Sequence, residues 1–150
     1  MEELNFKLKT KTKLPISRQT VITIFLTNNA IKTELLNVLK PHGLSIEQFN
    51  VLRILRGQNG NPLNLQDIQE RMVNKMSNTT RLVDKLILKD FVNRTECKKN
   101  RRKIEIYITR TGLEKLQEID DIVTKTEEKI TSNLTHTELI ELNRLINKIQ

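Results

Sequence analysis

The stretch that decides the fold is MSNTTRLVDKLILKDFVNRTECKKNRRKIEIYITRT, residues 76–111. It begins with the amphipathic spacing of a helix and continues as two runs with strand character, 91–96 and 104–108. Five cations occupy the six residues 98–103 between those runs, so the sequence predicts a hairpin with a basic turn. A helix can enter the major groove of DNA, while a cationic hairpin beside it contacts phosphates or the minor groove.

Two helices are expected upstream of this stretch. Apolar positions recur at three- and four-residue steps over 17–40, and Pro41 and Gly43 end that pattern. Ser45 and Gln48 then have the spacing of a capping box, which predicts the start of a second helix.

Two shorter helices follow. Asn64 is placed to cap a helix that reaches about Met72. The helix of the opening stretch is predicted to begin near 74–77 and to run to about Lys89. Its core candidates are Leu82 and Leu86, with Val83 as a further one.

Downstream of the hairpin, Thr109 is expected to cap a long helix, and Thr135 with Glu138 forms a capping box that opens a last one. Both helices carry an apolar stripe, with Leu113, Leu116, Ile119, Val123 and Ile130 in the first and Leu139, Leu142, Leu145, Ile146 and Ile149 in the second.

This order of elements predicts one unit, 1–150, that is mainly α with a small β-hairpin. The part 44–112 has the pattern of a winged helix-turn-helix. The helices in 17–40 and 113–150 are too long and too apolar on one face for so small a domain, so we expect them to form a dimerisation region. Residues 1–16 are expected to be an N-terminal arm.

The net charge of +8 is unevenly distributed along the chain. Residues 1–112 hold 21 Lys and Arg against 10 Asp and Glu, a balance of +11, whereas residues 113–150 hold 5 against 8, a balance of −3. A basic front part favours a polyanionic partner, although lysine-rich surfaces are also common in soluble proteins.

Several classes of protein are disfavoured by composition. The single Cys97 allows no intramolecular disulfide, and the isolated His42 and His136 suggest neither a zinc site nor any other metal site. We expect no cofactor and no enzymatic activity, since no nucleophile–base pair and no glycine-rich phosphate loop is evident. No apolar run has membrane-spanning length, so a cytoplasmic protein without membrane contact is expected.

The predicted recognition helix carries the candidate DNA-contact residues Ser77, Asn78, Thr80, Arg81 and Lys85, and the first four lie at its start, where they can reach base edges. Arg81 can bond guanine O6 and N7 bidentately, and Asn78 suits adenine N6 and N7. Short polar residues also favour helix starts in any protein, so the adjoining basic hairpin is what strengthens this interpretation.

The predicted wing supplies the candidate phosphate contacts, which are Lys98, Lys99, Arg101, Arg102 and Lys103. Lys85 and Lys89 can flank the groove at the DNA backbone, and Asp84 and Asp90 are expected to pair with neighbours or to limit non-specific binding.

The stretch TTRLVDKLILKDFVNRTECKKNRRKIEIYITRTG closely resembles the MarR family of bacterial transcriptional regulators. That family has an Arg-Leu-Val-Asp-(Arg/Lys)-Leu helix, an Asp-x-Arg wing and a Leu-Thr-x-x-Gly entry to a long helix. The segment 81–86 matches the first element, Arg102 matches the wing arginine, and 108–112 matches the last with Ile in place of Leu. The opening of the second helix, 44–49, is also similar, and the resemblance spans roughly 17–149.

One position departs from the family pattern. Asn100 stands where the family has the wing aspartate, whose carboxylate helps to orient nearby arginines. Asn offers only neutral hydrogen bonds, which are weaker, so Asn100 is expected to orient the wing less firmly while making it more cationic.

The resemblance implies a homodimer that binds double-stranded DNA at a pseudo-palindromic operator, most often as a repressor, and that is released by a small lipophilic or phenolic effector. Some relatives instead sense oxidants through a cysteine in the first helix, a position that Cys97 does not match. Lys98 and Lys99 can lower the pKa of a neighbouring thiol, so a redox-responsive regulator is one alternative. A winged-helix module that binds protein or RNA is another.

Overall fold

The structure is a computed structural model that describes residues 14–97 and 100–149 and the side chains of these residues except 97 and 100–103. Nearly all of the predicted arm, together with Lys98 and Lys99, lies outside the described residues. The elements in chain order are α2 (Ile16–Leu39), the 3-10 turn η1 (Lys40–His42), α3 (Ile46–Arg56), α4 (Leu65–Arg71), α5 (Thr79–Ile87), β1 (Val92–Cys97), β2 (Asn100–Ile108), α6 (Arg110–Thr131) and α7 (His136–Asn147).

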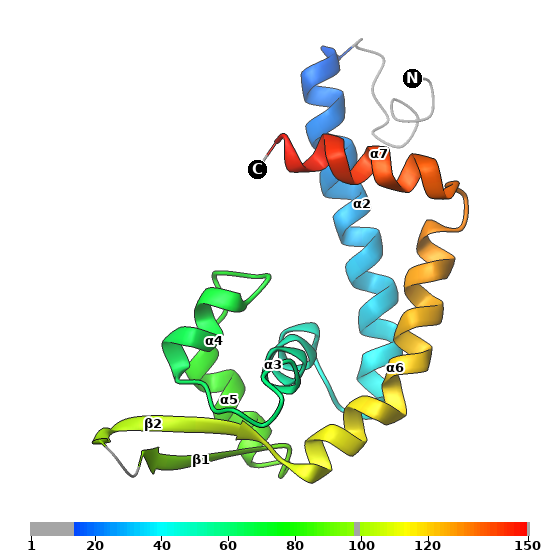
Figure 1. The fold of residues 1–150 in the computed structure, drawn as a ribbon. Helices are drawn as coiled ribbons and strands as arrows, with labels where there is room; N and C mark the ends of the chain where they lie inside the picture. Colours follow the sequence, from blue (N-terminus) through cyan, green and yellow to red (C-terminus); the bar gives the residue numbers. More distant parts are fainter. Residues whose placement is uncertain (1–13, 98–99, 150) are drawn as a thin grey trace.

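The elements form two regions (Figure 1). The long helices α2 and α6 pack side by side, and α7 crosses α2 at the end that is farther from the hairpin. The helices α3, α4 and α5 and the two strands gather at the opposite end. The predicted mainly α fold with a small β-hairpin is therefore confirmed. In the described ranges, no helix combines the length and the apolar character needed to cross a bilayer.

The helix starts follow the predicted caps. In the box at Ser45, the hydroxyl accepts from the Gln48 N–H at 3.1 Å and the Gln48 amide oxygen accepts from the Ser45 N–H at 3.1 Å. Asn64, Thr109 and Thr135 cap their helices with the same hydrogen bond, because each side chain accepts from the backbone N–H three residues later. Each cap satisfies a helix-end amide and contributes about 1 kcal/mol.

The predicted start of α5 near 74–77 is wrong. The helix begins at Thr79, and Asn78 is its N-cap, with Oδ1 accepting from the Arg81 N–H at 3.0 Å. The preceding residues instead form a turn, in which the Met76 N–H donates to Asn74 Oδ1 at 3.1 Å. Side-chain-to-backbone bonds from Asn compete with helix formation, and here they shorten the helix at its start.

The predicted turn of the hairpin is also too long. The predicted second strand began at residue 104, but β2 begins at Asn100 and pairs with β1 in antiparallel register, from Val92–Ile108 to Cys97–Asn100. Arg101, Arg102 and Lys103 therefore belong to a strand. Their polar sequence concealed this because a hairpin that extends into solvent needs backbone pairing but no apolar face.

A third backbone segment pairs with the hairpin. Leu63 exchanges two hydrogen bonds with Ile106, at 3.1 and 2.8 Å, so the loop before α4 forms an isolated bridge to β2. The bridge fixes the hairpin to the helix-turn-helix and buries both side chains.

The core lies where α3, α4, α5, the hairpin and α6 meet. Its members are almost fully buried and include Leu52, Leu55, Ile68, Val83, Leu86, Ile106, Leu116 and Ile119. In α5, Val83 is 2% exposed and Leu86 is also buried, whereas the predicted core residue Leu82 is only partly buried. The apolar residues of α7 and of the first half of α2 are largely outside this core.

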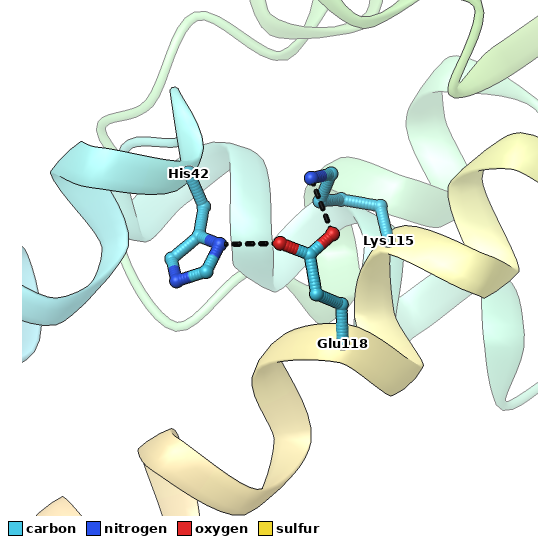
Figure 2. A network of polar contacts seen from close by, with 3 residues as sticks. All are labelled: His42, Lys115 and Glu118. Carbon is cyan, nitrogen blue, oxygen red and sulfur yellow. Dashed lines mark hydrogen bonds and ion pairs between the residues drawn. The ribbon is translucent and has the colours of Figure 1, made fainter.

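Polar contacts join α6 to both regions. Glu118 of α6 lies between His42 Nδ1, at 2.9 Å, and Lys115 Nζ, at 2.6 Å (Figure 2). The hydrogen bond from Lys115, followed by that from His42, holds the pKa of Glu118 below its ordinary value. Two residues further along α6, Asp120 accepts two hydrogen bonds from the Arg56 guanidinium at 2.6 and 3.1 Å. These contacts attach η1 and the end of α3 to α6.

Gly112 gives a test of the packing between the hairpin and α6. It is buried in the first turn of α6, and a Cβ at this position would collide with the backbone oxygen of Phe91. That oxygen also accepts the Thr109 N–H at 3.0 Å, so it cannot move freely. We expect Gly112→Ala to lower the free energy of unfolding by about 1–3 kcal/mol in a denaturant titration.

Gly57→Ala is the matched control, since Gly57 has a helical φ of −63° and a Cβ there would meet only ordinary contacts at 3.5 Å. If both variants unfold at the same denaturant concentration, the close approach at Gly112 is not a constraint on the fold.

Candidate nucleic-acid interface

The pair α4–α5 forms a helix-turn-helix whose second helix has two distinct faces. Thr79, Val83 and Leu86 point into the core. Thr80, Arg81, Asp84 and Lys85 are exposed on the opposite side. The spacing that predicted an amphipathic helix is therefore confirmed, and the exposed side carries three of the predicted DNA-contact residues.

An open groove runs along this exposed side. It has a volume of about 430 Å³ and lies between the start of α3 and α5. Its lining residues are Ser45, Glu47, Asn74, Ser77, Asn78, Arg81, Leu82 and Lys85. The structure thus brings four of the five predicted recognition residues together, while Thr80 lies outside the groove on exposed α5 surface. Two cations and one carboxylate, that of Glu47, give the groove a net positive charge.

Ser77 and Asn78 lie differently from the prediction, because both precede the helix. The Asn78 oxygen already accepts the Arg81 N–H, so bidentate pairing with adenine requires this oxygen to accept a second hydrogen bond. The Ser77 hydroxyl oxygen is buried and has no hydrogen-bond partner among the described residues. A base contact by Ser77 needs another side-chain rotamer.

The turn between α4 and α5 is held by side chains that the sequence analysis did not single out. Gln69 of α4 donates from Nε2 to the Lys75 carbonyl at 2.7 Å and accepts the Thr79 hydroxyl at Oε1. Asn50 of α3 accepts the Val73 N–H at Oδ1 at 2.9 Å. These contacts determine where α5 starts. No periodic pattern indicates them, because the partners belong to different elements.

The wing is tied to α5 at its base. Arg94 of β1 donates from Nη1 to Asp84 Oδ1 of α5 at 3.1 Å. The expected pairing of Asp84 is thereby confirmed, and Arg94 is a further residue that the sequence analysis missed. Both side chains are about half exposed, so the ion pair orients the two elements more than it stabilises the fold.

The end of α5 is fixed as well. Lys89 donates from Nζ to the Gly43 carbonyl at the α2–α3 junction and is not among the residues that line the groove. Asp90 adopts a left-handed φ of 59° and its Oδ2 accepts the Thr111 hydroxyl at 3.1 Å, so its expected pairing is confirmed too.

The other predicted wing residues are only partly located. Lys98 and Lys99 lie outside the described residues. Asn100, Arg101, Arg102 and Lys103 are placed by their backbone in β2, and the side chains of these residues and of Cys97 are not described. Their contacts with DNA, the orienting role of Asn100 and the redox role of Cys97 stay predictions. Within the described ranges, no three His, Cys, Asp or Glu side chains gather as metal ligands.

Comparison with known proteins gives a consistent result. Residues 44–104 match the model of the MarR family. The chain is 28% identical over 143 residues to the uncharacterized HTH-type transcriptional regulator YpoP of Bacillus subtilis (strain 168), with 95% of this chain and 97% of that protein covered.

Solved structures share the fold. A MarR transcription factor from Planctomyces limnophilus is 27% identical with a TM-score of 0.69, covering 91% of this chain and 98% of that one. A mutant MarR from E. coli in complex with operator DNA is 23% identical with a TM-score of 0.76, covering 85% of this chain and 90% of that one.

The hydrogen bond between Thr79 and Gln69 can be tested by substitution. Thr79 is 5% exposed, and Thr79→Val leaves the Gln69 oxygen without its donor. We expect the free energy of unfolding to fall by about 1–3 kcal/mol, the usual cost of a buried polar group that loses its partner.

Thr80→Val is the control one position later, because Thr80 is exposed and has no hydrogen bond from its side chain among the described residues. Its effect on thermal unfolding should stay within about 0.5 kcal/mol. Equal stability of both variants would show that the Gln69 contact does not hold the turn.

Proposed function

We propose that this chain, whose residues 44–104 match the model of the MarR family, is a transcriptional regulator of that family and binds a pseudo-palindromic DNA operator as a homodimer. The observation that carries the proposal is the exposed face of α5, which presents Arg81 and Lys85 beside a groove and next to a basic hairpin. The similar fold of an E. coli MarR in complex with operator DNA supports it.

In this proposal α5 enters the major groove. Arg81 reads guanine, Thr80 and Asn78 contact neighbouring bases, and Ser77 joins them if its hydroxyl turns outward. Lys85 lies one turn beyond Arg81 on the same face, where a cation meets the phosphate backbone.

The hairpin supplies the second half of the interface. Its cations contact phosphates or enter the minor groove beside the recognition helix, and Asn100 orients the wing through neutral hydrogen bonds. The residues proposed for these DNA contacts are Lys98, Lys99, Arg101, Arg102 and Lys103. The ion pair of Arg94 with Asp84 supports this arrangement, since it ties the hairpin to the same helix that enters the groove.

The exposed apolar residues of α2 and α7 support a homodimer. Phe25 and Val21 on α2, Ile140 on α7 and Ile149 just after α7 are each more than half exposed. A second copy of the chain buries such a surface symmetrically, as is usual for soluble oligomers. We further propose that the dimer works in the cytoplasm as a repressor and that a small lipophilic or phenolic effector releases it.

Arg81 tests the reading of sequence by α5. We expect Arg81→Ala to weaken binding to an operator by about 1–3 kcal/mol and to relax base preference at one position, measured by fluorescence anisotropy on operator and scrambled duplexes.

Arg81→Lys is the matched control, since it keeps the charge and removes the bidentate fork. It should retain affinity for scrambled DNA while losing the preference. If Arg81→Ala weakens binding equally on both duplexes, Arg81 contacts phosphate and does not read bases.

Phe25 tests the dimer. Its side chain is 63% exposed in α2, so Phe25→Asp leaves the fold of one chain intact but places a charge in the proposed interface. Sedimentation equilibrium should show a dimer for the wild type and a monomer for the variant, with unchanged helix content by circular dichroism.

Asn93→Asp adds an acidic charge at an exposed position of β1 and should stay dimeric. Dimerisation of Phe25→Asp with wild-type affinity would remove this surface of α2 from the interface.

A further inference from the structure

Two large apolar side chains in the α4–α5 turn are almost fully exposed. Met76 is 93% exposed and Val73 is 87% exposed. The turn connects α4 and α5 in the winged part of the molecule, whereas α7 crosses α2 in the other region (Figure 1). These residues are therefore separate from the apolar surface of α2 and α7 that the homodimer accounts for.

The backbone of this turn is firmly held although its apolar side chains face water. The Met76 N–H donates to Asn74 Oδ1 at 3.1 Å, and the Ser77 N–H donates to the Asn74 carbonyl at 3.2 Å. Gln69 fixes the Lys75 carbonyl at 2.7 Å, and Asn50 fixes the Val73 N–H at 2.9 Å. The turn thus presents Met76 from a defined backbone, which is the arrangement of a contact residue.

The position of Met76 determines what it can contact. It precedes the N-cap Asn78 by two residues and stands between Asn74 and Ser77, which line the groove together with Arg81. The first residues of a recognition helix approach base edges. The groove that Asn74 and Ser77 line also contains two cations, Arg81 and Lys85, against one carboxylate, Glu47, so this position suits DNA better than an apolar protein partner.

The major groove offers one apolar feature, the C5 methyl group of thymine, whereas the other base edges there present donors and acceptors. We propose that Met76, with Val73 beside it, packs against thymine methyl groups and makes this turn a determinant of specificity. Methionine suits this contact because its unbranched, polarisable side chain adapts to the surface it meets. The inference rests on the proposed function and adds thymine to the bases that the protein reads.

The test compares thymine with uracil, which differ only by the methyl group. The full-length protein first selects duplexes from a random-sequence library, and each thymine of the selected site is then replaced singly by uracil. At one or two positions in each half-site, wild-type affinity should fall about threefold, the effect of one buried methyl group.

Met76→Gln keeps the length of the side chain and removes its apolar character, so this variant should bind the thymine and uracil duplexes equally at those positions. Leu88→Gln is the matched control. Leu88 is 86% exposed just beyond the other end of α5, and its variant should keep the wild-type response to uracil. Thermal unfolding of both variants should match the wild type, since neither side chain is in the core.

Three results overturn the inference while leaving the proposed function intact. The first is a selected site to which uracil duplexes bind as tightly as thymine duplexes. The second is a Met76→Gln variant that retains the difference between them. The third is a Met76→Gln variant that binds DNA normally but sediments differently, which would assign Met76 to a protein contact. Failure of the wild type to select any sequence overturns the proposed function and this inference together.

Discussion

The contact between Gln69 and the first residue of α5 is the constraint on which the proposed interface depends. One amide side chain binds the Lys75 carbonyl and the Thr79 hydroxyl, so it sets both the path of the turn and the position where the helix begins. Arg81 and Lys85 project from that helix, and Arg94 ties the hairpin to it through Asp84. A shift of this start would move the groove and the wing together. Precise presentation of a binding surface requires such supporting contacts behind the residues that touch the ligand.

The two regions of the molecule are joined through α6. Its first turn lies against the Phe91 carbonyl at the end of the hairpin, and its middle carries Glu118 and Asp120, which bind η1 and α3. The winged part is thereby fixed relative to α2 and α6, the helices that lead to the proposed dimer surface. In a symmetric dimer, the geometry of that surface sets the distance between the two recognition helices and hence the spacing of half-sites. In the proposed dimer, the ion pairs on α6 would therefore bear on the choice of operator although none of their residues lines the groove.

The sequence predicted well whatever depends on residues that are close in the chain. The caps at Ser45 and Thr135 and the buried face of α5 follow from spacings of three and four residues, and the structure has them. Prediction from the sequence failed where a competing hydrogen bond, or a partner distant in the chain, determines the local structure. Asn74 and Asn78 shorten α5, and the bridge from Leu63 to Ile106 joins segments more than 40 residues apart. The extension of β2 through three cations was missed because backbone pairing has no signature in side-chain polarity. The sequence could suggest candidate base-contacting residues because their chemistry matches base edges, and their role stays a prediction, whereas Gln69 and Arg94 act on other residues and give no such signal.

The central claim is that two copies of α5 occupy successive major grooves on one face of DNA, with a wing beside each. Hydroxyl-radical footprinting of the full-length protein on its selected duplex tests this most directly. The account predicts a two-fold symmetric pattern, with two protected half-sites whose centres lie about 10 base pairs, one helical turn, or a multiple of it apart. A flanking protection on the outer side of each half-site should mark the wing. A single unsymmetrical footprint, or uniform protection without defined half-sites, would contradict the account.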